Sequence, residues 1–338
     1  EEIWYPKHLS LEQCSSEITA RYKARLSQGD SLTDLTGGFG IDCSFLATGF
    51  KSATYVERQE ELCEIAAHNF PILHLNHINV RNEDGVAYLQ TMSPVDCIFL
   101  DPARRNEHGG KTVSIADCEP NVAELEDLLL SKASRIMIKL SPMLDLSLAL
   151  KELKHTQEVH ILSVNNECKE LLILLGQTSP AEITIHCVNL FTKGTQEEQH
   201  FVFTREQEQR SQCTYTDSLG DYLYEPNASL LKAGAFRSIA AAYPVRKLHP
   251  NSHLYTSDTF IENFPGRIFR IVNQCSFNKK EVKENLADLK KANVTVRNFP
   301  ATVAELRKRL HLTEGGDTYL FASTLNNGQK VIIRCEKV

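Results

Sequence analysis

One stretch near the start of the chain, residues 32–42, constrains the fold more than any other. It runs from a short apolar segment that carries Asp34 into a turn that contains Gly37, Gly38 and Gly40. Glycines in such a turn let the backbone bend sharply and approach a ligand, because no Cβ stands in the way. The residues after the turn have the pattern of a helix. The stretch therefore predicts a strand, a tight turn and a helix in succession.

The same alternation continues for about a hundred residues. Apolar strand candidates alternate with amphipathic helical stretches, and the predicted strands are residues 32–36, 53–57, 78–81, 95–101 and 135–140. This alternation is typical of an α/β fold in which a parallel sheet carries helices on both faces. The ligand of such a sheet binds at the carboxyl ends of its strands.

Four carboxylates stand at or just beyond the ends of successive predicted strands, at Asp34, Glu57, Asp84 and Asp101. Glu57 comes 20 residues after Gly37, a spacing at which an acid can accept hydrogen bonds from ribose hydroxyls. Asp84 follows the third strand and can accept a hydrogen bond from the amino group of adenine. Acids in this arrangement suit a bound nucleoside that carries a positively charged reactive centre.

The order and spacing of these features resemble the class I S-adenosylmethionine (SAM) methyltransferases. The resemblance implies SAM as the cofactor and a Rossmann-like, doubly wound sheet of seven strands, closed by a hairpin of residues 159–164 and 171–175. It also implies a role for each residue of the motifs. The methionine part of SAM is expected against Asp34, Thr36, Gly37, Gly38 and Gly40, the ribose at Glu57, the adenine at Asp84, and the reactive end at Asp101 and Pro102, with Asp101 as the catalytic residue.

NAD is the alternative cofactor, because its binding sites also use a glycine turn and a ribose-binding acid. The turn in this chain has the spacing Gly-Gly-x-Gly, whereas the turn that cradles a dinucleotide pyrophosphate reads Gly-x-Gly-x-x-Gly. An Asp-Pro pair also follows the fourth strand. Both features favour SAM over NAD.

The segment after the fourth strand, Asp101-Pro102-Ala103-Arg104, stands where methyltransferases carry the loop that faces the acceptor. Enzymes that methylate amines usually have a second proline and an aromatic residue there, and this chain has neither. The segment is closer to the Asp-Pro-Pro-Arg of several RNA methyltransferases. Enzymes that methylate pyrimidine C5 need a cysteine, often after the next strand, where this chain reads Lys139-Leu-Ser-Pro. Cysteine chemistry is therefore not expected.

Three basic residues near these motifs are candidates for substrate binding. Arg104 and Arg105 can grip a phosphate through paired hydrogen bonds. Lys139, at the end of the fifth predicted strand, can line the substrate cleft. Structural ion pairs with nearby acids are the alternative for all three.

The chain as a whole resembles a bacterial family of class I methyltransferases with THUMP-like and ferredoxin-like C-terminal domains. Four motifs carry this resemblance, at residues 34–40, 100–105, 139–142 and 222–234. The predicted domains are an N-terminal helical segment (1–30), a methyltransferase domain (31–190), a THUMP-like region (191–265) and a small ferredoxin-like α+β module (266–338). THUMP domains bind structured RNA, so the resemblance implies tRNA or rRNA as the substrate.

The net charge of −6 conceals an asymmetry between the two ends of the chain. Residues 266–338 hold fourteen Lys and Arg against seven Asp and Glu, a net charge of +7, which leaves −13 for the rest. A basic tail suits a polyanionic partner such as RNA, although solvated lysines on outer helix faces are the alternative. Two other functions stay open. The protein could be an RNA-binding adaptor with a vestigial nucleotide site, or a small-molecule methyltransferase.

Cysteine and histidine usage indicates no metal. No two of the ten cysteines are closer than Cys168 and Cys187, so the chain offers neither a Cys-x-x-Cys knuckle nor a compact disulfide framework. No apolar run approaches the ~20 residues of a membrane span, and the start does not resemble a signal peptide. A reduced cytoplasm is the expected compartment. The sequence begins with Glu1 rather than Met, so we expect an N-terminal piece to be missing.

Overall fold

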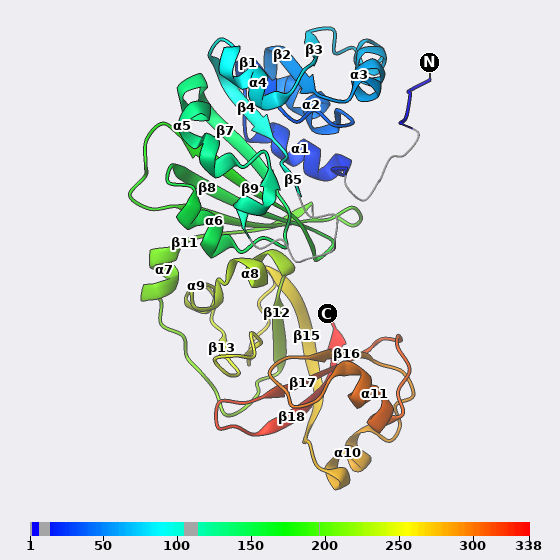
Figure 1. Cartoon of the computed structure of the whole chain (residues 1–338). Helices are drawn as coiled ribbons and strands as arrows, with labels where there is room; N and C mark the ends of the chain where they lie inside the picture. The colour runs from blue at the N-terminus through cyan, green and yellow to red at the C-terminus, as the bar shows by residue number, and fades with distance from the viewer. Residues whose placement is uncertain (1, 7–13, 105–113, 196) are drawn as a thin grey trace. The chain divides into compact units, whose positions relative to one another are not determined.

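The computed structural model describes residues 2–6, 14–104, 114–195 and 197–338. The chain forms two compact units, Glu1–Glu198 and Gln199–Val338 (Figure 1). Eight of the nine strands of one sheet fall within the first unit, and a seven-stranded sheet belongs to the second. No helix in the described part of the chain has both the length and the apolar character that a membrane span requires.

The large sheet has the strand order β3-β2-β1-β4-β7-β9-β8-β10-β11. The first five strands in this order run parallel, and β9 runs antiparallel between β7 and β8. The predicted parallel sheet with a closing antiparallel hairpin is therefore confirmed. The expected number of seven strands was too small, because β10, parallel to β8, and β11 extend the edge. The strands are β1 (Gly29–Asp34), β2 (Phe50–Glu57), β3 (Ile78–Asn82), β4 (Val95–Leu100), β7 (Ala133–Leu140), β8 (Thr156–Val164), β9 (Glu167–Gly176), β10 (Thr184–Leu190) and β11 (Glu198–Thr204).

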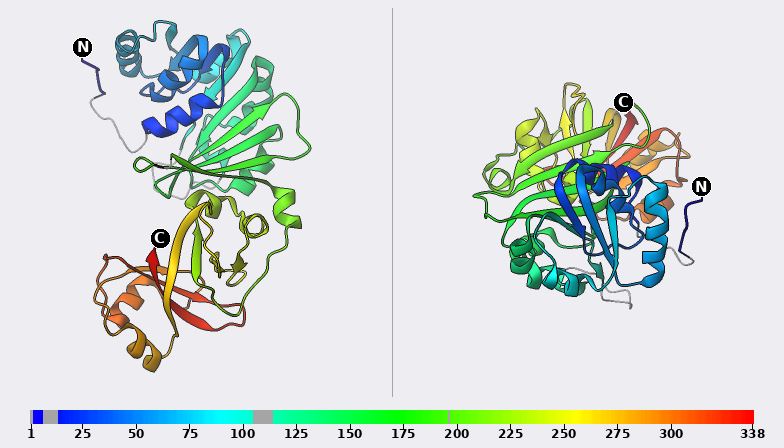
Figure 2. Two further views of the ribbon diagram at one scale, coloured as in Figure 1. Left: turned by 180° about the vertical axis from the view of Figure 1, so that it is seen from behind. Right: turned by 90° about the horizontal axis from the view of Figure 1, so that it is seen from above.

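Helices cover both faces of this sheet, as Figures 1 and 2 show. The helices of the first unit are α1 (Glu17–Arg25), α2 (Ile41–Leu46), α3 (Glu60–Ile72), α4 (Gly85–Thr91), α5 (Val122–Lys132) and α6 (Leu146–Glu152), and a short ribbon of β5 (Ala103–Arg104) and β6 (Cys118–Glu119) follows β4. The N-terminal helix α1 buries Tyr22 in an apolar cluster with residues of β8, β9 and β10. Residues 7–13 of the predicted N-terminal helical segment (1–30) lie outside the described residues.

The main apolar core of the first unit lies directly under the glycine turn. It is built from β1, β2, β4, α2 and α3, and its largest members include Tyr55, Phe70 and Phe99. The rings of Tyr55 and Phe70 meet edge to face with centroids 5.5 Å apart. Because these rings are buried and close-packed, they form a rigid floor for the turn above them.

The second unit has a sheet with the order β13-β14-β12-β15-β18-β17-β16. Its long strand β15 pairs with β12 on one side and β18 on the other, so one sheet runs through residues 222–338. The elements are α7 (Arg205–Arg210), β12 (Tyr222–Pro226), α8 (Ala228–Ala233), α9 (Phe236–Ala242), β13 (Arg246–Lys247), β14 (Tyr255–Ser257), β15 (Gly266–Ser276), α10 (Lys279–Leu286), β16 (Asn293–Val296), α11 (Val303–Leu310), β17 (Thr318–Thr324) and β18 (Lys330–Lys337).

The turn into α4 gives a test of how tightly the strand ends pack. A Cβ added at Gly85 would come within 2.1 Å of the carbonyl oxygen of Leu35, so the backbone would have to move. We expect Gly85→Ala to lower the free energy of unfolding by about 1–3 kcal/mol, measured by denaturant melting. Gln90→Ala, on the exposed face of the same helix, should change it by less than about 0.5 kcal/mol. Equal stabilities of the two variants would contradict this close packing.

Candidate functional site

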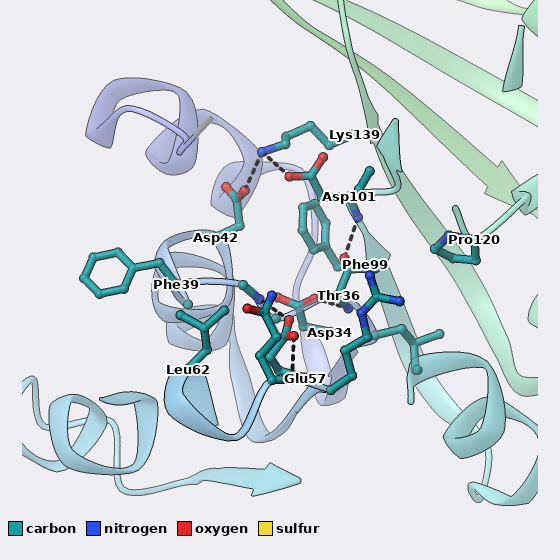
Figure 3. Close-up of a pocket in the computed structure, with 18 of the residues that line it drawn as sticks. Asp34, Thr36, Phe39, Asp42, Glu57, Leu62, Phe99, Asp101, Pro120 and Lys139 are labelled. Carbon is teal, nitrogen blue, oxygen red and sulfur yellow. Dashed lines mark hydrogen bonds and ion pairs between the residues drawn. The ribbon is translucent and has the colours of Figure 1, made fainter. Parts of the chain in front are cut away.

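A pocket of about 880 Å³ opens where β1, β2 and β4 end in the first unit (Figure 3). The structure brings most of the predicted site residues to this pocket, which is lined by Asp34, Thr36, Gly37, Gly38, Gly40, Glu57, Asp84, Asp101 and Lys139 together with other residues. Pro102 is buried, and the pocket lining passes from Asp101 to Ala103 without it. The carboxyl ends of parallel strands thus gather the acids at one edge, as the alternation of elements predicts.

The glycine turn needs its glycines for two separate reasons. Gly38 and Gly40 have φ angles of 53° and 83°, in the left-handed region that favours glycine. At Gly37 a Cβ would lie only 2.3 Å from the ring of Tyr55, so the turn could not sit so close to the core. The Tyr55 hydroxyl in turn donates to the carbonyl of Gly38. The backbone of the turn therefore forms a bare wall of the pocket.

Glu57, the last residue of β2, holds this turn in place. Its Oε2 accepts a hydrogen bond from the Gly38 amide at 2.9 Å, and its Oε1 accepts one from the Gln59 amide at 2.9 Å. Each carboxylate oxygen has a second lone pair. Glu57 can therefore fix the loop and still accept hydrogen bonds from a ligand in the pocket.

Asp34 ties the ends of β1 and β4 together through Thr36. Oδ1 of Asp34 accepts from the Thr36 amide at 3.0 Å, and the Thr36 hydroxyl accepts from the Asp101 amide at 2.6 Å. Burial raises the pKa of Asp34 to about 8, against the opposing effect of the Thr36 amide, and the charges of Asp42 and Asp101 add to the rise. A positively charged group in the pocket would be attracted to the ionised form of Asp34.

Asp84 caps helix α4 at the far end of the pocket. Its Oδ1 accepts from the amides of Val86 and Ala87, both at 3.0 Å. The residue is exposed and also lines the pocket. Asp84, which is predicted to bind adenine, is thus also the N-cap of α4. Its hydrogen bonds to the first turn of the helix fix the direction of its carboxylate.

At the opposite end of the pocket, Lys139 lies between two carboxylates, as Figure 3 shows. Its Nζ is 2.6 Å from Oδ2 of Asp101 and 3.2 Å from Oδ2 of Asp42. Although burial lowers the pKa of Lys139, the charges of Asp101 and Asp42 raise it above its ordinary value overall. Burial raises the pKa of Asp101, and Lys139 opposes this rise. The ammonium and the carboxylate of this pair both face the pocket.

A second lysine that sequence reasoning missed supports this pair from behind. Lys23 of α1 is fully buried, and its Nζ lies 2.9 Å from Oδ1 of Asp42 and 2.6 Å from Oε2 of Glu170. Ser15 donates to Asp42 at 2.8 Å and accepts from Lys23 at 2.8 Å and from Lys139 at 3.1 Å. The available signal was the helical spacing of α1, which puts Lys23 on the same buried face as Thr19 and Ala20.

The structure does not test the two arginines that were predicted to bind phosphate. Arg104 lies on β5, where its backbone pairs with Cys118, and its side chain is not among the described groups. Arg105 lies outside the described residues. Their role stays a prediction.

A group of potential metal ligands lies away from the pocket, at Glu158, His160 and His186. The two imidazole rings stack with centroids 4.3 Å apart and planes 7° from parallel, and Nδ1 of His160 is 2.8 Å from the Tyr22 hydroxyl. A ring nitrogen binds a metal in the plane of its ring, and two stacked planes do not meet at one ion. The group as it stands does not fit a metal centre, and the absence of a metal stays a prediction.

Family models match three parts of the chain. One described as protein-L-isoaspartate(D-aspartate) O-methyltransferase matches residues 7–106, a ferredoxin-like domain matches 222–265, and a THUMP domain-like model matches 266–337. The last two names stand in the opposite order to the one expected. Both regions mix short strands with helices, and they share one sheet through β12 and β15, so the pattern of elements alone does not distinguish them.

One solved structure shows the family. The crystal structure of a "putative methyltransferase" from Porphyromonas gingivalis W83 is 38% identical, covers 99% of this chain and 84% of that chain, and has a TM-score of 0.90. The chain belongs to this family, which joins a class I methyltransferase fold to ferredoxin-like and THUMP-like C-terminal domains.

More distant structures resemble part of the chain only. An rRNA methylase from Streptococcus thermophilus is 14% identical, covers 47% of this chain and 93% of that chain, and has a TM-score of 0.33. An O-methyltransferase from Bacillus cereus in complex with SAH is 13% identical, covers 49% and 83%, and has a TM-score of 0.39. Neither similarity supports a substrate for this chain. A search of curated protein sequences finds no match.

The buried contacts of Lys23 predict a large effect on stability. Lys23→Met would leave Asp42 and Glu170 buried with one ammonium fewer, so we expect the free energy of unfolding to fall by about 3–5 kcal/mol in urea melts. Lys51→Met is the matched control, because Lys51 pairs with Asp30 at the surface, and it should have little effect. If both variants unfold at the same urea concentration, the buried network does not stabilise the first unit.

Proposed function

We propose that this protein is a SAM-dependent methyltransferase that acts on RNA. The observation that carries the proposal is the order of residues along the pocket. The bare glycine turn, Glu57 and Asp84 follow one another along successive strand ends, and the Asp101–Lys139 pair lies at the other end. A nucleoside and a reactive centre can be held at these two ends at once.

The residues present fit SAM. The turn at Gly37 and Gly38 has no side chains to obstruct a close ligand. Asp34 can hold the ammonium, Glu57 the ribose hydroxyls, and Asp84 the adenine amino group. When bound, SAM supplies a methyl group on a positively charged sulfur. The chain contributes position and a fixed electrostatic field, which are the main requirements of an in-line displacement.

The second unit supports RNA as the substrate. The THUMP-like match covers residues 266–337, the same part of the chain that carries the net charge of +7. Exposed basic side chains lie on and around α10 and α11, at Lys279, Lys280, Lys283, Lys290, Lys291, Lys308 and Arg309. Phosphate contacts from such residues supply most non-specific affinity for nucleic acid, and this affinity falls steeply as salt rises.

The same surface would also serve an RNA-binding adaptor, so the experiment must measure transfer. The full chain is incubated with SAM labelled in its methyl group and total bacterial RNA, and label in precipitated RNA is counted. Labelled RNA supports the enzyme. RNA binding without transfer, in a protein that also fails to bind S-adenosylhomocysteine (SAH), would support the adaptor with a vestigial nucleotide site instead.

Binding of SAH tests the cofactor assignment directly. We expect micromolar affinity for SAH and none for NAD in calorimetric titrations of the full chain. Glu57→Gln should weaken SAH binding by about 10- to 100-fold, because hydrogen bonds to a charged group are lost. The control Glu60→Gln, exposed on α3, should bind as the parent does. Unchanged affinity in Glu57→Gln would remove Glu57 from the site.

The raised pKa of Asp34 predicts proton release on binding. With a pKa of about 8, Asp34 is mostly protonated at pH 7, and a ligand ammonium beside it favours the ionised form. SAH binding at pH 7 should therefore release roughly one proton, and affinity should rise with pH between 6 and 8. Calorimetry in buffers of different ionisation enthalpy measures this release. Asp34→Asn should abolish the release, and equal heats in all buffers for the parent would contradict the assignment.

A further inference from the structure

We propose that the methyl acceptor is a hydroxyl oxygen, the 2′-hydroxyl of a ribose within RNA. The residues that point to this acceptor are Lys23, Asp42, Asp101, Lys139 and Glu170, called the charged cluster below. The inference rests on the function proposed above and specifies the atom on which that function acts.

The charged cluster joins side chains from four elements and one loop at the acceptor end of the pocket. Glu170 on β9 pairs with Lys23 on α1 at 2.6 Å, Lys23 pairs with Asp42 on α2 at 2.9 Å, and Asp42 pairs with Lys139 on β7 at 3.2 Å. The chain of contacts ends with Lys139 and Asp101 at 2.6 Å. Three of the five, Asp42, Asp101 and Lys139, line the pocket, and the other two lie behind them.

The pair at the pocket offers a proton acceptor and a positive donor side by side. Asp101 keeps about a third of its side chain exposed (36%), whereas the Lys139 side chain is 9% exposed. Their partners hold Lys139 in one orientation, so its ammonium is preorganised rather than free to swing into solvent. A group that binds here meets a carboxylate and an ammonium together.

This pair suits an oxygen acceptor better than an amine. An amine nitrogen gains positive charge as it attacks a methyl group, and a fixed ammonium beside it would oppose that change. A hydroxyl oxygen instead loses its proton and gains negative character, which an ammonium stabilises. The loop agrees, because Ala103 and Arg104 stand where amine-methylating enzymes carry a second proline and an aromatic residue.

Carbon and carboxylate acceptors fit the cluster less well. Attack through pyrimidine carbon needs a thiolate, but burial raises the pKa of Cys14, the cysteine that lines the pocket, and so keeps it protonated. A carboxylate acceptor carries its own negative charge and needs no base. It would meet a cluster that holds three carboxylates against two lysines. A neutral hydroxyl meets neither obstacle, and RNA offers one at every ribose.

The reaction balances with the residues in place. The hydroxyl oxygen forms a bond to the methyl carbon while the carbon–sulfur bond breaks and leaves its electron pair on sulfur. The hydroxyl proton passes to the carboxylate of Asp101, and the Lys139 N–H that faced this carboxylate turns to the oxygen as negative charge develops. The products are a 2′-O-methyl ribose, a neutral thioether and protonated Asp101, which then returns its proton to water. The raised pKa of Asp101 makes it a better base than an ordinary aspartate.

Alkaline hydrolysis distinguishes the acceptors. A 2′-O-methyl group blocks cleavage of the neighbouring phosphodiester, so its label stays in alkali-stable dinucleotides, whereas label on a base is released in mononucleotides. RNA methylated by the full chain with labelled SAM is hydrolysed and separated. Label in dinucleotides supports the inference, and label in mononucleotides overturns it while the proposed function stands. No labelled RNA from a protein that binds SAH overturns both.

Variants assign the roles within the cluster. We expect Lys139→Met to lower kcat by about 100- to 1,000-fold with SAH affinity unchanged, because it removes a donor to the developing charge. Lys169→Met, an exposed lysine on β9, is the matched control and should keep full activity. Glu170→Gln, which acts through Lys23, should lower kcat and shift the pH–rate profile without changing KM for SAM. Equal activity of Lys139→Met and its control would overturn the assignment.

A binding measurement tests the same contact without turnover. An oligonucleotide centred on the labelled position is compared with one that carries a single 2′-deoxyribose there, both titrated into the full chain with SAH. The deoxy substitution should weaken binding by about tenfold in the parent, because a charge-assisted hydrogen bond is lost. It should have no such effect in Lys139→Met. Equal binding of both oligonucleotides by the parent would overturn the proposed contact.

Discussion

The first unit depends on the burial of two lysines and two carboxylates in one place, with the partly exposed Asp101 beside them. A single charge in this position would be costly, and each member of the cluster is tolerated only because its neighbours compensate it. The helix α1 supplies Lys23, so this helix contributes to the network of charges behind the pocket. The parallel sheet positions Asp101 and Lys139, and α1 completes the network that keeps them oriented.

The acids at the other end of the pocket are held by hydrogen bonds from the backbone and not by ion pairs. Glu57 and Asp84 accept hydrogen bonds from backbone amides of the turns that they face, so their carboxylates are already fixed before a ligand arrives. A side chain held in this way loses little freedom on binding. The sequence alone cannot distinguish an acid that stabilises a turn from one that binds a ligand. Both kinds of acid stand at the end of a strand, and here the same residue can do both.

Periodicity predicted the parallel sheet, because strand burial leaves a local pattern in the sequence, and the resemblance to class I methyltransferases implied its closing hairpin. The cluster left no such pattern. Lys23 and Glu170 are 147 residues apart, and a lysine in a helix reads as a solvated residue until its partners are known. Lys139 was expected to line the substrate cleft, with an ion pair as the alternative; it lines the pocket and pairs with Asp42 and Asp101, and its role toward a substrate stays a prediction. The two C-terminal names were exchanged because both regions alternate strands and helices and share one sheet.

The division of the pocket explains how one fold can serve different acceptors. In the proposed function the glycine turn, Glu57 and Asp84 bind only the methyl donor, so they would carry little information about the atom that receives the methyl group. That information lies in the few residues beyond Asp101, where a stacking aromatic would favour a flat base and an oriented ammonium favours an oxygen that gives up its proton. In this chain the ammonium is present, and its orientation is secured by charges from a helix outside the sheet. If the proposed acceptor is right, the preference for oxygen depends on tertiary contacts, and the loop sequence shows only that a second proline and an aromatic residue are absent.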